Sequence, residues 1–146
     1  MELTTDQKGA VAESAIVHAA LKLGVGVFRP VSDGERYDLI FNLQSGLVRV
    51  QCKWAPLDGD VVIVRCYSCR RAREGLRRRT YLPEDVDVIA AYCADLDRCF
   101  LLTCKDFDRH PVVWLRLTPS RNNQRRRINW ADEFGFEARL RALQGP

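Results

Sequence analysis

The segment from Leu47 to Trp54 alternates between two kinds of side chain, and this alternation constrains the fold more than any other feature of the chain. Apolar residues occupy one set of positions and polar residues the set between them: Val48, Val50, Cys52 and Trp54 against Arg49, Gln51 and Lys53. Successive side chains of a β-strand point to opposite faces. The segment therefore predicts a strand in which Gln51 and Lys53 point the same way.

Further strands are predicted on both sides of this segment. Residues 37–42 should pair with it as a β-hairpin, because the polar turn 44–46 separates two apolar runs. Other β-branched runs predict strands, and the C-terminal segment predicts one or two helices: strands at 60–67, 86–92, 100–103 and 112–117, and helices within 130–143. A chain of 146 residues can bury a core of its own, so we expect one domain over residues 1–146.

A helix is predicted near the start of the chain. Thr4 and Gln7 have the spacing of a capping box, in which a hydroxyl and an amide three residues later satisfy backbone groups at the helix start. Small and apolar residues recur at helical spacing as far as Leu23, and Gly24 suits the left-handed conformation that ends a helix. Glu13 lies at the edge of the predicted buried stripe.

The cysteines bear on the cellular compartment. No segment approaches the ~20 apolar residues that a membrane span needs, and the polar start of the chain does not resemble a secretory signal. We therefore expect a cytoplasmic protein, without membrane contact, whose six cysteines stay reduced. Structural zinc is the less favoured alternative, because Cys66 and Cys69 have CxxC spacing but Cys99 and Cys104 do not.

Arginines gather in two clusters, although the net charge of the chain is only +4. The clustered residues are Arg70, Arg71, Arg73, Arg77, Arg78 and Arg79, and then Arg121, Arg125, Arg126 and Arg127. A guanidinium presents a planar fork that matches phosphate oxygens, so the clusters suggest a polyanionic partner. A solvated basic face is the alternative. Lys8 is a further candidate for a phosphate contact, because a helix N-terminus favours anions, and a capping or surface role is the alternative.

Four polar residues fall where a metal-assisted reaction would need them. Pairing through the turn at 44–46 would place Asp38 opposite the neighbourhood of Gln51. Magnesium prefers oxygen ligands, which Asp38, the Gln51 amide and the Cys52 carbonyl would supply, with Glu13 binding directly or through water. Lys53 would orient water and stabilise developing negative charge. These are the groups that magnesium-assisted cleavage of a phosphodiester would need.

The same residues lie in segments that resemble the PD-(D/E)xK nuclease superfamily, and more closely its branch of cyanobacterial group I intron homing endonucleases, which carries Gln-x-Lys. The segments are Thr4-x-x-Gln7-Lys8-Gly9-x-x-Ala12-Glu13, Arg36-Tyr37-Asp38-Leu39-Ile40, Val50-Gln51-Cys52-Lys53, and the runs 81–92 and 129–134. The resemblance implies an α/β fold with a restriction-endonuclease-like core, a central mixed β-sheet flanked by helices in an αβββαβ-like order. It also implies Mg²⁺ or Mn²⁺ as cofactor and cleavage of double-stranded DNA.

Two departures from the superfamily pattern keep other functions open. Tyr37 replaces the proline of the motif, and Gln51 replaces an acid, which removes one negative charge and should weaken magnesium binding. Gln51 keeps a catalytically silent DNA-binding module open as one alternative. A structure-specific nuclease acting on junctions is another, because the resembling superfamily also contains small domains that do this. A symmetric duplex target needs two cutting sites, so we expect a homo-oligomer with two-fold symmetry, either a dimer or a tetramer.

Overall fold

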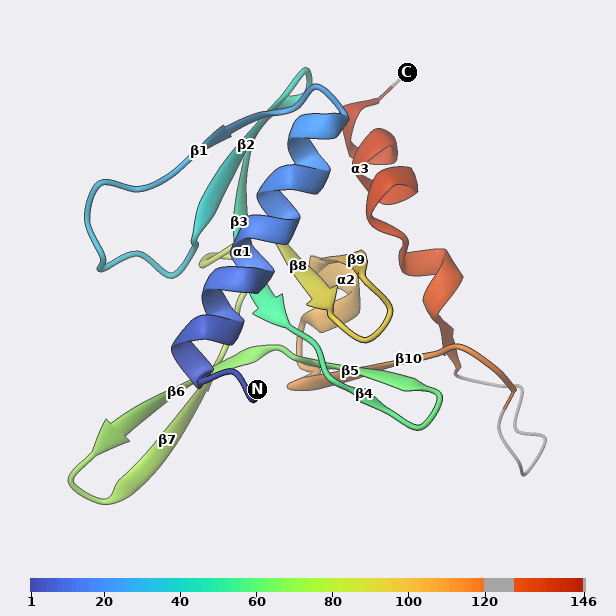
Figure 1. Cartoon of the computed structure of the whole chain (residues 1–146). Helices are drawn as coiled ribbons and strands as arrows, with labels where there is room; N and C mark the ends of the chain where they lie inside the picture. Colours follow the sequence, from blue (N-terminus) through green and yellow to red (C-terminus); the bar gives the residue numbers. More distant parts are fainter. Residues whose placement is uncertain (120–127, 146) are drawn as a thin grey trace.

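A five-stranded mixed sheet forms the centre of the fold (Figure 1). The computed structural model describes residues 1–119 and 128–145, with the backbone but not the side chains of Arg70 and Arg71. The strand order is β1 (Gly26–Phe28), β2 (Leu39–Leu43), β3 (Gly46–Trp54), β8 (Val88–Cys93) and β9 (Arg98–Thr103). The β3–β8 pair is parallel and the other pairs are antiparallel. The predicted central mixed sheet is confirmed.

Helix α1 (Thr5–Lys22) covers one face of this sheet, beside α3 (Phe136–Gln144) (Figure 1). The Thr4 hydroxyl accepts from the Gln7 amide N–H and the Gln7 side chain accepts from the Thr4 N–H, so the predicted capping box is present. Gly24 follows the helix with a φ of 77°, as its predicted role requires. The apolar core on this side joins the two helices to β2, β3, β8 and β9.

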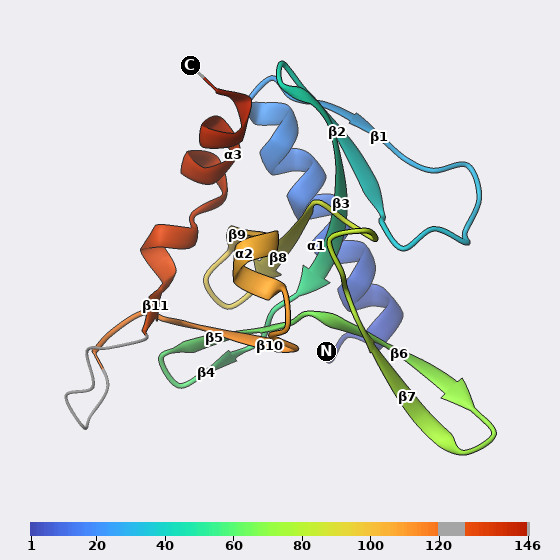
Figure 2. The ribbon, with the colours of Figure 1, turned by 180° about the vertical axis from the view of Figure 1, so that it is seen from behind.

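A second sheet and the short helices cover the other face (Figure 2). Its strand order is β11 (Asn129–Trp130), β10 (Val112–Arg116), β5 (Val61–Arg65) and β4 (Leu57–Asp58). The helical segments on this side are α2 (Cys104–Phe107) and the 3-10 turn η1 (Ala131–Phe134). Strand β8 contributes Ile89 and Ala91 to this core, and Val88 and Ala90 to the core under α1. It is therefore buried on both faces, as a central strand should be.

Two parts of the chain differ from the expected order of elements. The run at 60–67 forms β5 in the second sheet, and β1 completes the antiparallel three-stranded meander with β2 and β3 instead. The arginine-rich segment, for which the sequence predicted no regular structure, forms a two-stranded hairpin of β6 (Tyr67–Ala72) and β7 (Gly75–Thr80). This hairpin projects away from the sheets (Figures 1 and 2). No helix within the described ranges is long and apolar enough to cross a membrane.

Candidate active site

The site begins where β3 continues beyond the start of β2. The last ladder bond between these strands runs from the Asp38 N–H to the Val50 carbonyl, at 2.8 Å. Two residues further along β3, the Cys52 N–H donates instead to Asp38 Oδ2, at 2.9 Å. The carboxylate thus satisfies a backbone donor of β3 that β2 no longer reaches. Leu39 pairs with Val50. The same register continued by one residue places Asp38 opposite Gln51, in the neighbourhood that the sequence predicted.

Asp38 lies within the electrostatic reach of two other predicted residues. Burial raises the pKa of its carboxyl, and the charge of Glu13 raises it further, whereas the Cys52 N–H and the ammonium of Lys53 act to lower it. The net shift is upward. A partly buried carboxylate with a second carboxylate and a cation nearby is a group whose ionised form a divalent ion would stabilise.

The remaining predicted ligands lie beside Asp38. The Gln51 amide donates from Nε2 to the Cys52 carbonyl at 3.3 Å, so these two groups are already adjacent. Burial, together with the charges of Asp38 and Glu13, raises the pKa of the Cys52 thiol well above its ordinary value. The thiol therefore stays protonated, and the carbonyl is the group of Cys52 that is suited to a hard cation.

The donor set fits magnesium better than zinc. Across residues 1–119 and 128–145, no three His, Cys, Asp or Glu side chains gather as a metal site. The cysteines there are free, with Cys66 buried and Cys69 exposed. Magnesium, in contrast, needs only one or two carboxylates, with water and substrate oxygens completing its shell. Asp38, Glu13 and two neutral oxygens are donors of the kind that such a magnesium site would use.

Glu13 has a partner that sequence reasoning missed. Its carboxylate accepts from Arg29 Nε at 2.9 Å, and the two side chains are 31% and 59% exposed. Arg29 follows β1 directly, so the link joins α1 to the loop that leads to Asp38. The contact balances the charge of Glu13 from outside the sheet. Only the position of Arg29 after an apolar run marked it in the sequence, and that signal is weak.

The side chain of Lys53 lies on the face of β3 opposite to that of Cys52. It contacts the base of the β6–β7 hairpin, which is the end where Tyr67 begins β6. Its Nζ donates to the Tyr67 carbonyl at 2.8 Å and lies 4.9 Å from the centroid of the Tyr81 ring. The Arg36 guanidinium lies 4.3 Å from the centroid of the same ring. The buried Tyr81 therefore contacts two cations. Sequence reasoning assigned no role to Arg36, Tyr67 or Tyr81, because long-range packing alone brings them to Lys53.

The predicted DNA-contacting residues are mostly exposed. Arg73 lies in the hairpin turn, and β7 carries the three consecutive arginines Arg77, Arg78 and Arg79, all of them exposed. Lys8 lies in α1 with its ammonium 5.8 Å from the centroid of the Trp54 ring, near the end of β3. The other predicted residues lie outside the described part of the structure, in full or in their side chains: Arg121, Arg125, Arg126 and Arg127, and the side chains of Arg70 and Arg71.

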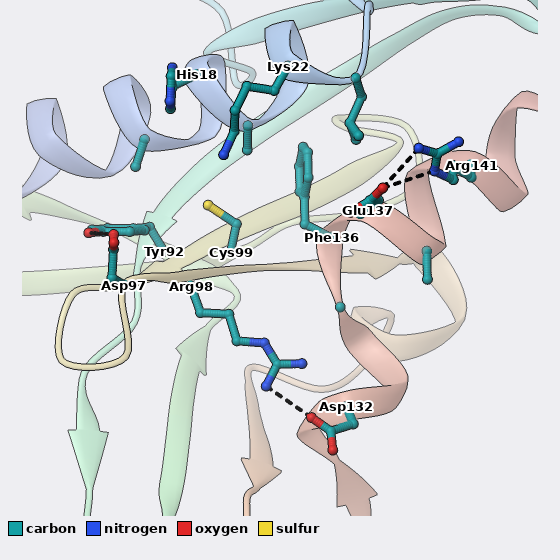
Figure 3. A pocket seen from close by; sticks show the side chains of 15 residues that line it. His18, Lys22, Tyr92, Asp97, Arg98, Cys99, Asp132, Phe136, Glu137 and Arg141 are labelled. Carbon is teal, nitrogen blue, oxygen red and sulfur yellow. Dashed lines mark hydrogen bonds and ion pairs between the residues drawn. The ribbon is translucent and has the colours of Figure 1, made fainter.

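A cavity of about 1080 Å³ lies elsewhere, between α1, α3 and the end of the β8–β9 hairpin (Figure 3). None of the four predicted active-site residues is among the described residues that line it. Four of its charged side chains form two ion pairs: Arg98 with Asp132 at 3.0 Å, and Arg141 with Glu137 at 2.9 Å. The four predicted active-site residues therefore lie outside this cavity.

Comparisons with known proteins identify the family and the fold. No curated protein matches the chain. The structure of a bacterial homing endonuclease, I-Ssp6803I, matches with a TM-score of 0.78 and 25% identity, over 98% of this chain and 96% of that one. The sequence profile of the PD-(D/E)XK endonuclease family matches residues 3–137. The recognised resemblance and the fold class are thereby confirmed, and the chain belongs to the PD-(D/E)XK endonuclease family.

Proposed function

We propose that this nuclease hydrolyses phosphodiester bonds of double-stranded DNA with Mg²⁺ or Mn²⁺, as a homing or mobile-element endonuclease. One observation carries the proposal. The Asp38 carboxylate, held by the Cys52 N–H at 2.9 Å, lies within the electrostatic reach of both Glu13 and Lys53. The likeness to I-Ssp6803I, a bacterial homing endonuclease, supports the choice of substrate.

Each residue of the site has a distinct task in this proposal. Asp38, the Gln51 amide oxygen and the Cys52 carbonyl hold the cation, with Glu13 binding it directly or through water. The bound ion would polarise the phosphate and lower the pKa of a water molecule. Lys53 stabilises the negative charge that develops on the attacked phosphate, because its ammonium is held by the Tyr67 carbonyl and needs little reorganisation. Glu13 would give up its contact with Arg29 to bind the cation directly.

The decisive experiment is cleavage of plasmid DNA with and without magnesium. Lys53→Ala and Asp38→Ala should each lower the cleavage rate by about a hundredfold or more, the loss expected for an electrostatic group at the reacting centre. Lys105→Ala is the matched control, since Lys105 is an exposed lysine of the short helix α2. It should cleave like the unmodified protein. Equal cleavage by Lys53→Ala and Lys105→Ala would exclude the proposed site.

A catalytically silent DNA-binding role is the second candidate, and Gln51 is the observation that favours it. A neutral amide supplies less charge to a divalent ion than an acid would, and Gln51 here donates a hydrogen bond to the Cys52 carbonyl. Binding of duplex DNA without any magnesium-dependent cleavage would favour this role. Cleavage that appears only in Gln51→Glu would do the same.

Two finer points belong to the same proposal. A four-way junction tested beside linear duplex separates a structure-specific nuclease from a sequence-directed one, because only the first cuts the junction preferentially.

We also propose a homo-oligomer, a dimer or tetramer, because both strands of a symmetric target must be cut. Light scattering during size-exclusion chromatography measures its mass, and a monomer that remains monomeric on DNA would contradict it.

A further inference from the structure

We propose that the tip of the β6–β7 hairpin enters the major groove of duplex DNA and reads base edges. The inference deepens the proposed function and rests on it for the identity of the ligand. A two-stranded ribbon is one of the two regular elements that the major groove, about 12 Å wide, admits. The hairpin is such a ribbon, with a turn of only Arg73 and Glu74 between the paired residues Ala72 and Gly75.

The side chains at the tip offer three different chemistries to a ligand. Arg77, Glu74 and Leu76 are each exposed, at 69%, 71% and 71%. A guanidinium fork matches the two acceptors of guanine, a carboxylate accepts from the amino group of cytosine, and an apolar side chain contacts the methyl group of thymine. Arg77 pairs with Glu74, which orients its fork before DNA binds. Together these residues can distinguish base pairs.

A hairpin that only contacted phosphates would have a different tip. Glu74 is repelled by phosphate, and Leu76 gains nothing from it, yet both lie at the end that projects furthest from the sheets. Phosphate contacts fix the position of a protein on the duplex but carry no sequence information, whereas base-edge contacts do. The composition of the tip therefore favours base reading over simple charge attraction.

The base of the hairpin is held rigidly, which a reading element needs. Arg36 donates to the Ser68 hydroxyl and to the Arg79 carbonyl, each at 3.2 Å, and so contacts both strands. Asp85 pairs with Arg36 at 3.5 Å and with Arg79 at 3.8 Å. The side chain of Arg36 therefore connects the ribbon to the segment that precedes β8.

This base is also the part of the hairpin that contacts the proposed catalytic lysine. Lys53 Nζ bonds to the carbonyl of Tyr67, the first residue of β6. From there the tip lies five residue steps away, about 17 Å along a strand. At about 3.4 Å per base pair, this distance corresponds to about five base pairs. We expect the bases that the tip reads to lie within about five base pairs of the bond that is cut.

The test selects bound sequences from a library of DNA duplexes with a randomised centre, in EDTA so that no cleavage occurs. The variants are Arg77→Ala, Leu76→Ala and Glu74→Gln, all at exposed positions. Arg141→Ala is the matched control, because Arg141 also pairs with a glutamate, Glu137, and the two are 67% and 63% exposed. Arg77→Ala should relax the preference at one or two neighbouring positions by about ten- to a hundredfold. The control should select the same sequences as the unmodified protein.

The outcomes separate this inference from the proposed function. An unmodified protein that selects no sequence, or tip variants that keep its preferences, would overturn the inference. A uniform loss of affinity across all sequences would overturn it too, since that is the behaviour of phosphate contacts. Selection without any later magnesium-dependent cleavage would refute the nuclease proposal and leave the hairpin inference standing. Where cleavage occurs, the mapped cuts should lie within about five base pairs of the affected positions.

Discussion

The sheet under α1 and the β6–β7 hairpin differ in how far their side chains are buried. In the first, side chains such as Phe41, Val50 and Leu101 are completely buried and connect the sheet to two helices. In the second, every residue of β7 is exposed. Hydrophobic burial is the main favourable contribution to folding, so stability comes from the first region. Strand β7 contributes no buried residue and presents charge instead, which suits the proposed contact with DNA.

The two regions nevertheless meet around Lys53. The lysine belongs to β3 of the central sheet but donates to Tyr67 in the hairpin. Arg36, two residues before Asp38, holds the other side of the hairpin base. The proposed chemistry is therefore located where a rigid, buried region and an exposed, charged region touch. Separate mutations can test whether the two regions contribute stability and recognition independently.

The largest effect should come from removing a buried ring. Phe41 is completely buried and packs edge-to-face with Phe136, with 6.1 Å between ring centroids. Phe41→Ala should lower the free energy of unfolding by about 3–5 kcal/mol, because it removes apolar contacts and leaves a cavity. Leu76→Ala in the hairpin should change it by no more than about 0.5 kcal/mol. Urea denaturation measures both free energies of unfolding. Similar losses in the two variants would refute the claim that stability comes from the sheet under α1 and not from the hairpin.

A second prediction concerns metal binding at the border between the regions. At a magnesium concentration about a hundredfold above the dissociation constant, the ion should stabilise the fold by about 2.7 kcal/mol. Asp38→Ala should abolish this increase, because it removes the ligand that the Cys52 N–H holds in place. Thermal denaturation with and without Mg²⁺ measures it. Asp58→Ala, at an exposed position of β4, is the control and should keep the full increase.

The same contrast explains what the sequence could predict. The alternation along β3 and the capping box at Thr4 are local signals produced by burial and by backbone hydrogen bonding, and both elements occur as predicted. Asp38 and Gln51 could be paired because the hairpin register follows from the short turn between the strands. These features all depend on residues that are near each other in the chain.

The rest depended on contacts between distant segments. The hairpin has no buried face in β7, so the sequence lacks the period-two apolar pattern that marks a strand. The ring of Tyr81 contacts the cations of Arg36 and Lys53, which lie 45 and 28 positions earlier in the chain. No local sequence feature marks Tyr81 as their partner. The assignment of β5 to a second sheet is likewise a matter of tertiary packing.

A third prediction separates the base of the hairpin from its tip. Arg78 lies 4.7 Å from the centroid of the Tyr67 ring, and Arg79 pairs with Asp85, so both are held near the base. If each contacts one phosphate, the double replacement by alanine should flatten the log–log salt dependence of DNA binding by about 1.8, which is about 0.9 per contact. Affinity should fall alike for all sequences. Fluorescence anisotropy over a salt series measures this, and an unchanged slope would mean that both arginines face solvent.

The smallest effect should come from the contact between Asp87 and Arg49, which lies where the chain passes from the β6–β7 hairpin back into the central sheet. Asp87 accepts from the Arg49 backbone N–H at 2.7 Å and from two nitrogens of the Arg49 guanidinium, each at 3.2 Å. Burial alone would raise the pKa of Asp87, but these hydrogen bonds outweigh it and lower the pKa below 3.8. Because the pKa is lower in the folded state, the contact stabilises the fold above about pH 4, and this stability is lost as the pH falls through the lowered pKa.

Asp87→Asn should therefore cost stability at about pH 7 and cost progressively less toward about pH 2. The Asp87 side chain is 41% exposed, so solvent screening limits the cost to about 0.2–1 kcal/mol. Urea midpoints at both pH values measure it, with Asp58→Asn as the control for a carboxylate outside this contact. Since Arg49 also donates to the Glu84 and Pro83 carbonyls, it would still hold the returning segment in the variant. A variant that loses DNA selectivity as well as stability would show that the sheet and the hairpin are coupled through Asp87 rather than independent.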